Sequence, residues 1–221
     1  MKVCKLLAFA LTLVMALSSS TMCLAAMQGD VDQATAVLQR FQEIPEKSIP
    51  PAVLRQAKGL AIITVTKAAF IVSARGGTGV VVARVGKGWS GPSAIGTGGA
   101  GFGFQIGAQV TEFVIILNTP DAVKAFSQGG NVSLGADLSV AAGPVGREAS
   151  ADILPMAAVY TYSRSQGLFA GVSLEGTVLV SRDDTNREYY SRKVVTPSDI
   201  LSGKIKAPKG AQSLLKVLSR Y

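Results

Sequence analysis

The 221-residue chain contains no histidine, and this absence narrows the chemistry available to it. Histidine is the commonest general base and the commonest metal ligand in proteins. Ser-His and Cys-His catalysis is therefore excluded for this chain acting alone. Asp, Glu, Ser, Tyr and Lys remain, but no recognisable spacing pairs them into a catalytic set. The sequence accordingly predicts a protein that is not an enzyme and needs no cofactor.

Cysteine is nearly as scarce, since Cys4 and Cys23 are the only two. Both lie in residues 1–25, which have the basic start, short apolar run and small residues before Ala26 that are typical of a signal peptide. We expect cleavage after Ala25 and export to the periplasm or beyond. Met22 stands where lipoprotein processing requires a small side chain, which argues against a lipid anchor at Cys23. The remaining chain would have no disulfide and no cysteine-based metal or redox site.

Acidic residues are in the minority, with 14 against 22 basic ones and a net charge of +8. The excess is concentrated after Ile200, where five basic residues and no acidic one occur. A basic tail of this kind suits anionic lipid head groups or nucleic acid, and it equally suits a solvated chain end. Export and the modest overall charge disfavour nucleic acid as a partner.

Hydrophobic periodicity changes along the chain and predicts the fold class. Helical spacing over residues 30–58 and 196–221 encloses a region, residues 60–195, of short alternating runs and most of the 24 glycines. This order predicts an α+β fold with a curved or barrel-like antiparallel β-sheet and helices from both ends of the chain. We expect a single domain over residues 26–221.

Individual boundaries follow from turn and cap residues. Asp30 is expected to cap a helix over residues 30–43, and Thr119 and Thr196, each followed by proline, to cap two short helices. Glycines predict a turn at residues 74–78 and a loop over 86–101. A change of alternation predicts a β-bulge near Thr111-Glu112, and residues 183–186 are expected to form a hairpin loop.

Two local motifs need a structural context to carry function. Residues 96–101 match the dinucleotide pattern G-x-G-x-x-G, but a strand pattern follows them where a helix is required, so a nucleotide site is not expected. Trp89 is the only tryptophan and follows Lys87-Gly88. It suits either insertion into a membrane interface or closure of one end of the core.

A series of ordered motifs extends over most of the chain after residue 30. They are Ile49-Pro50, Ala57–Ile62, Gly76–Arg84, Gly88–Ser93, Gly98–Gly107, Ile116–Thr119, Ala142–Arg147, Tyr162–Gly176 and Asn186–Tyr190. Together they resemble the SYLF domain family, and the chain looks like an exported bacterial member of that family. The chain differs from some relatives in carrying no SH3 or FYVE module.

The resemblance implies lipid binding rather than catalysis. Family members bind phosphoinositides and in some cases actin, through basic and amphipathic surface near the N-terminal helix. Export makes actin a doubtful partner for this chain, and anionic phospholipid or a membrane surface is the expected one. A structural or protein-interaction module of the cell envelope is the alternative. The residues expected to contact lipid are Arg40, Lys47, Arg55, Lys58, Trp89, Lys204, Lys206 and Lys209.

Overall fold

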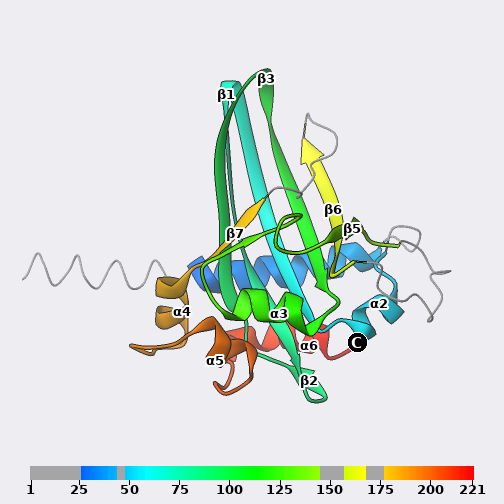
Figure 1. Cartoon of the computed structure of the whole chain (residues 1–221), viewed down its shortest axis with the longest axis vertical. Helices are drawn as coiled ribbons and strands as arrows, with labels where there is room; N and C mark the ends of the chain where they lie inside the picture. The colour runs from blue at the N-terminus through cyan, green and yellow to red at the C-terminus, as the bar shows by residue number, and fades with distance from the viewer. Residues whose placement is uncertain (1–25, 44–47, 145–156, 168–176) are drawn as a thin grey trace, which may run out of the picture.

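A long antiparallel hairpin dominates the computed structural model, which describes residues 26–43, 48–144, 157–167 and 177–221 (Figure 1). Strand β1 (Gly59–Val85) pairs with β3 (Ser93–Leu117) along almost its whole length, and β2 (Gly88–Trp89) pairs with the end of β1. The predicted turn at residues 74–78 and most of the predicted loop at 86–101 are therefore wrong, because both segments contain paired strand.

Two glycines in β1 serve close backbone approach rather than a turn. A Cβ atom added to Gly79 would lie 2.0 Å from the carbonyl oxygen of Ile62, and one added to Gly77 would lie 2.6 Å from that of Thr64. The two halves of β1 therefore touch each other where the sheet curls. Any side chain there would force the halves apart, which is the reason glycine occurs within these strands.

The hairpin bends across its full width near Phe70. Phe70 pairs with Ile106 whereas Val72 pairs with Phe102, so the register shifts at this point and the ribbon folds back. The bulge predicted near Thr111-Glu112 is wrong, because pairing with β1 and with β6 (Val159–Gly167) continues through these residues without interruption. The change of alternation instead reflects a change in what covers each face of the sheet.

The remaining strands complete a seven-stranded sheet within the described residues. Its order is β2-β1-β3-β6-β5, with β7 beside β3 and β4 beside β7. The predicted α+β class with a curled sheet and helices from both chain ends is confirmed, although β5 and β6 pair in parallel. The further strands are β4 (Asn131–Ser133), β5 (Val140–Ala142) and β7 (Val178–Ser181).

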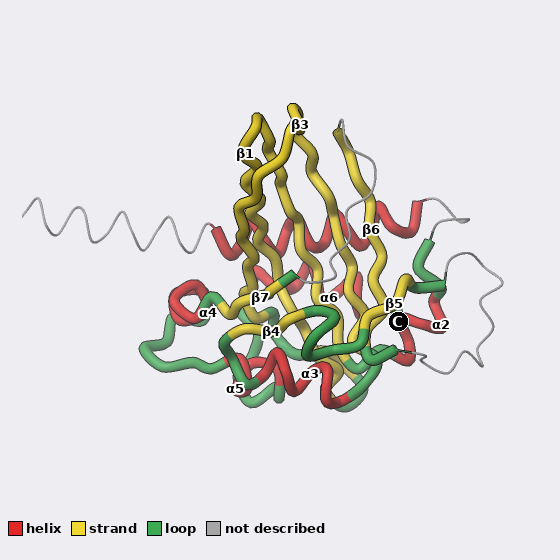
Figure 2. The backbone as a smooth tube through the Cα atoms, turned by 45° about the horizontal axis from the view of Figure 1, so that its top comes forward, coloured by secondary structure: helices red, strands yellow, loops and turns green. Residues whose placement is uncertain are grey.

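Helices cover both faces of the curled sheet at its lower end (Figures 1 and 2). One buried cluster joins even-numbered β1 residues such as Ile62 to the N-terminal helix (residues 26–43), and another joins odd-numbered ones such as Ile63 to α3. The sheet therefore has a core on each side. The helices after the first are α2 (Pro51–Gln56), α3 (Pro120–Ser127), α4 (Asp183–Tyr189), α5 (Pro197–Leu201), a 3₁₀ turn (Lys209–Ala211) and α6 (Gln212–Leu218).

Helix ends agree with the sequence where threonine precedes proline. The hydroxyl oxygens of Thr119 and Thr196 each accept a backbone N–H three residues on, at 3.1 Å, as predicted. Two other predictions are wrong. Asp30 lies within the N-terminal helix, where it accepts hydrogen bonds from Arg182 and Thr78, both at 2.6 Å. The expected hairpin loop at residues 183–186 is the start of α4.

Candidate functional site

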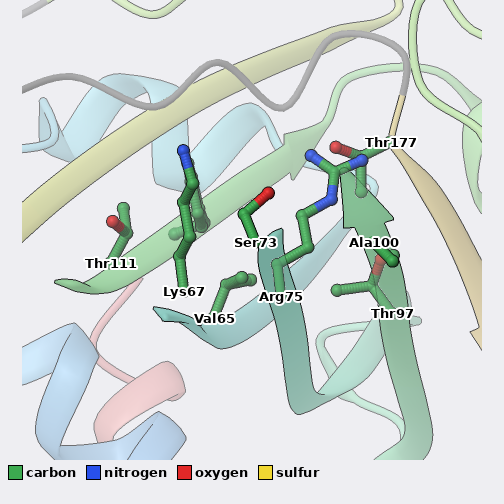
Figure 3. Close-up of a pocket in the computed structure, with 10 residues that line it drawn as sticks. Val65, Lys67, Ser73, Arg75, Thr97, Ala100, Thr111 and Thr177 are labelled. Atoms are coloured by element: carbon green, nitrogen blue, oxygen red, sulfur yellow. The ribbon is translucent and has the colours of Figure 1, made fainter. Parts of the chain in front are cut away.

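A cavity of about 250 Å³ lies between the two folded halves of the β1–β3 hairpin (Figure 3). Both halves of both strands contribute to its walls, so the cavity exists only because the hairpin bends. We name it the hairpin cavity. Its lining residues are Val65, Lys67, Ser73, Arg75, Thr97, Gly99, Ala100, Thr111, Phe113 and Thr177.

Two cationic side chains enter the hairpin cavity from the two halves of β1. Lys67 lies opposite Gln109 in the register and Arg75 lies opposite Gly99. Figure 3 shows both side chains directed to the same side, with Thr177 beside Arg75. None of the ten described lining residues is acidic. The described lining therefore combines two cationic side chains with four hydroxyl-bearing ones, of which Thr97 donates to the Val178 carbonyl at 2.8 Å.

Sequence reasoning missed these residues because it placed a turn at 74–78, which separated Arg75 from Lys67. A signal was present, since Val65, Lys67, Ser73 and Arg75 share one strand parity. Lys67 is also the only charged residue between Lys58 and Arg75. A continuous strand would have placed both cations on one face.

The opposite face of the sheet holds the first of the predicted lipid contacts. The Arg40 guanidinium forms an ion pair with the Glu112 carboxylate, and its Nε donates to Oε2 at 3.1 Å. Gln33 also donates to this carboxylate, at 3.3 Å. Glu112 is only 7% exposed. The structure thus gives Arg40 a role in fastening the N-terminal helix to β3.

Trp89 packs at the end of the core. Its indole N–H donates to the carbonyl of Leu218 at 3.0 Å, and the Arg84 guanidinium lies 3.9 Å from the ring centroid. The side chain is half-buried against the cluster below the sheet. Of the two interpretations of Trp89, the structure therefore supports closure of the core.

The other basic residues expected to contact lipid lie on exposed surface away from the hairpin cavity lining. Arg55 is in α2, and Lys58 immediately precedes β1. Lys204, Lys206 and Lys209 lie between α5 and the C-terminal helix, and Lys204 approaches Asp199 at 4.0 Å. Lys47 lies outside the described residues.

A shallow groove of about 660 Å³ lies between α3, α4 and the segment that leads into α5. We name it the α3–α5 groove. Val194 on its rim is 80% exposed, whereas the next residue, Val195, is buried. Lys124 and Lys193 are exposed beside it, and Arg187 pairs with Asp184. Asp183 also lines the groove, so apolar, cationic and acidic side chains meet there.

Two other kinds of site, a membrane-spanning helix and a metal cluster, are absent from the residues that the structure describes. No helix in this part of the chain has the length and apolar character to span a bilayer. Within the same residues, no group of three or more cysteine, aspartate or glutamate side chains is arranged to hold a metal ion.

Comparisons with known proteins identify relatives over most of the chain. A family model described as "Ysc84: Las17-binding protein actin regulator" matches residues 98–221. SH3 domain-containing YSC84-like protein 1 of Homo sapiens is 48% identical over 203 residues, which cover 88% of this chain and 59% of that protein. LAS seventeen-binding protein 3 of Saccharomyces cerevisiae is 51% identical over 178 residues, which cover 78% of this chain and 39% of that protein.

These relatives correct the expected partner. The sequence favoured anionic phospholipid, treated actin as doubtful and left a protein partner unknown. That prediction is wrong, because the matching family and the yeast relative are named for binding the protein Las17, and the family for actin regulation. The chain spans only 59% of the length of the YSC84-like relatives.

Proposed function

Because the chain belongs to the Ysc84 (SYLF) family, we propose that it is a non-catalytic domain that binds a protein partner of the actin-regulating type. The family description and the name of the yeast relative support a protein partner. The chain lacks histidine, which supports a binding rather than a catalytic role. This chain spans only about three-fifths of the human relative. The activity of the whole relative is therefore not assigned to it.

The exposure of Val194 is the observation on which we base the choice of the α3–α5 groove as the protein-binding surface. Val194 is 80% exposed, whereas the next residue, Val195, is buried in the core. Its position at the rim of the α3–α5 groove places it among Lys124 and Lys193. Such a surface fits a partner segment that combines an apolar side chain with acidic residues, because the apolar contact supplies affinity and the charges supply orientation.

We further propose that the chain is exported after removal of residues 1–25. The basic start, apolar run and small residues at the expected cleavage point support this. An exported domain would meet its partner outside the cell that makes it. Mass spectrometry of the protein recovered from cells that express the full chain should show a new N-terminus at Ala26. Recovery of a chain that still begins at Met1 would contradict export.

Binding can be tested with protein purified from cells that express the full chain. The probes are actin filaments, in a co-sedimentation assay, and purified Las17, in a titration followed by calorimetry. We expect saturable binding to at least one of them. Lys193→Glu should lower the affinity about tenfold and Val194→Ser about threefold to tenfold, because each removes a contact at the rim of the groove.

The matched control is Lys216→Glu, which makes the same charge change on an exposed residue of α6. Its affinity should stay within about twofold of the unchanged protein. Flotation with anionic vesicles provides the competing outcome. Vesicle binding without binding to either protein would overturn the proposal, and so would equal losses for Lys193→Glu and Lys216→Glu.

A further inference from the structure

Basic side chains from three separate segments gather at the lower end of the molecule, around the turn between β1 and β2 (Figure 1). We propose that this surface binds an acidic segment of a protein partner, at a place separate from the α3–α5 groove. The choice of a protein over a membrane rests on the proposed function. We name it the basic surface. Its cations are Arg55, Lys58, Arg84, Lys87, Lys204 and Lys206.

Close backbone packing holds the β1–β2 turn against the segment that follows α5. A Cβ atom added to Gly203 would lie 2.8 Å from Val85 Cγ1, and one added to Gly91 would lie 3.3 Å from the Ala207 Cα atom. These two contacts flank the turn in one segment and residues 204–206 in the other. The exposed lysines of the two segments therefore share one side of the molecule.

Arg84 connects α2 to the same surface. Its Nη2 donates to the Leu54 carbonyl at 3.1 Å, and its backbone N–H donates to the Lys58 carbonyl at 2.8 Å. The guanidinium also lies over the ring of Trp89. These contacts hold the end of α2, with its exposed Arg55, beside the turn.

Carboxylates are scarce around the basic surface. The sequence has no acidic residue between Glu46 and Glu112 and none after Asp199. Among the described residues, only Lys204 of these cations has a carboxylate within 4.0 Å, that of Asp199, and both side chains are exposed. An ion pair exposed in this way is weak. The surface therefore has a positive potential that favours the approach of an acidic partner.

Partly exposed apolar side chains lie among the cations. Trp89 and Ile205 pack against the buried cluster that includes the N-terminal helix, but both are only half-buried. Tryptophan and arginine are enriched where proteins bind one another, because they combine a large contact area with specific polar contacts. The partner segment is therefore expected to combine several acidic residues with a large apolar one.

Trp89 gives the test a local readout, because it is the only tryptophan of the chain and contacts Arg84. The probe is a short glutamate-rich peptide that contains two leucines, and the control peptide has glutamine in place of each glutamate. We expect the acidic peptide to change the Trp89 emission with a Kd of about 10–100 μM at low salt, and the control peptide to bind at least about tenfold more weakly. Raising the salt to about 0.3 M should weaken the acidic peptide about fivefold. Absence of saturable binding by the acidic peptide, or equal binding by both peptides, would overturn the proposal.

Charge reversals locate the binding. Lys87→Glu and Lys206→Glu should each weaken the acidic peptide about threefold to tenfold, because each removes a cation and adds a repulsive charge. Lys193→Glu makes the same change in the α3–α5 groove, and the peptide Kd should then stay within about twofold. Urea unfolding confirms that each variant is folded. A loss for Lys193→Glu as large as that for Lys87→Glu and Lys206→Glu would overturn the assignment to the basic surface.

The proposed function and the basic surface can fail separately. Peptide binding that depends on Lys87 and Lys206, without binding of actin filaments or Las17, would support the basic surface and overturn only the proposed function. Binding of those proteins that depends on Lys193, without peptide binding, would overturn only the basic surface. Anionic vesicles that change the Trp89 emission when the peptide does not would assign the surface to a membrane and overturn the proposal.

Discussion

The two ends of the β1–β3 hairpin have the same pairing but different surroundings. At the closed end, β1 residues 59–65 and β3 residues 111–117 are buried on both faces except for the half-buried Thr64. At the open end, which is the bend of the hairpin, the side chains described at residues 66–69, 73–78, 97–100 and 107–110 are exposed or half-buried, apart from the buried Ala69 and Gln109. The comparison teaches that one continuous strand can supply the core at one end and line a cavity at the other.

The physical cause is what packs against each face of the sheet. The closed end lies between the N-terminal helix and α3, so residues of both strand parities are buried there. At the open end, the inner parity changes from Ile63 and Val65 to Lys67, Ser73 and Arg75. Stability should therefore depend more on the closed end than on the open end. Three substitution experiments test this difference, from the largest expected effect on stability to the smallest, and a pH titration tests the buried tyrosines outside the hairpin.

Gly79→Ala should have the largest effect, because the new Cβ would lie 2.0 Å from the Ile62 carbonyl oxygen. We expect a loss of about 4 kcal/mol in the free energy of unfolding, or no folded protein. Gly76→Ala is the matched control, since nothing lies within 4 Å of its added Cβ, and its effect should be below about 1 kcal/mol. Urea unfolding measures both. Similar values for the two would disprove the close contact between the halves of β1.

Ile116→Ala at the closed end should lower the free energy of unfolding by about 3 kcal/mol, because Ile116 is fully buried and its removal leaves a cavity. Val110→Ala, at a position that is 40% exposed at the open end, should lower it by less than about 1 kcal/mol. Denaturant titrations of the pair compare the two ends directly. A larger loss for Val110→Ala would contradict the assignment of stability to the closed end.

Arg40→Ala should lower the free energy of unfolding by about 2 kcal/mol, because it leaves the largely buried Glu112 carboxylate without its charged partner. Adding Glu112→Gln to this variant should restore part of the loss, since a neutral amide has a smaller desolvation cost. Thermal unfolding of the single and double variants provides the measurement. An additive further loss in the double variant would show that the two side chains do not act as a pair.

High pH should destabilise the protein by ionising buried tyrosines, which stay neutral and packed at neutral pH. Burial, with a smaller contribution from Asp32, raises the pKa of Tyr189 to about 12, and burial also raises the pKa of Tyr162 and Tyr190. A tyrosine whose pKa is raised in the folded state contributes its full stabilisation of the fold below its unfolded-state pKa of about 10. That contribution is lost as the pH rises from there through the folded-state pKa. Absorbance titration should show delayed tyrosinate formation until unfolding. Ordinary titration near pH 10 in the folded protein would contradict the burial of these rings.

Part of the fold could be predicted because its signals are local. Thr119-Pro120 and Thr196-Pro197 combine a cap with a proline suited to the first helical turn, and both helices begin there. Helical periodicity in the first segment and strand alternation in the middle were also sufficient for the fold class. The signal in these cases comes from residues within one turn or strand of each other.

The candidate sites could not be predicted, because distant segments create them. Gly77 and Gly79 resemble turn residues in isolation, but their role depends on Thr64 and Ile62 on the far side of a bend. Arg40 looked like a free surface cation until Glu112, 72 residues away, was placed beside it. Val194 lies in a polar segment, and its exposure is visible only in the folded chain.

The sequence by itself determined the α+β class, the helix starts that threonine and proline specify, and the absence of histidine chemistry. Tertiary structure alone decided that β1 and β3 run through their glycines, bend together and enclose a cavity with Lys67 and Arg75 inside. The reason is the range of the interactions. Caps and periodicity act over a few residues, whereas the bend depends on backbone contact between strand halves that only the complete sheet brings together.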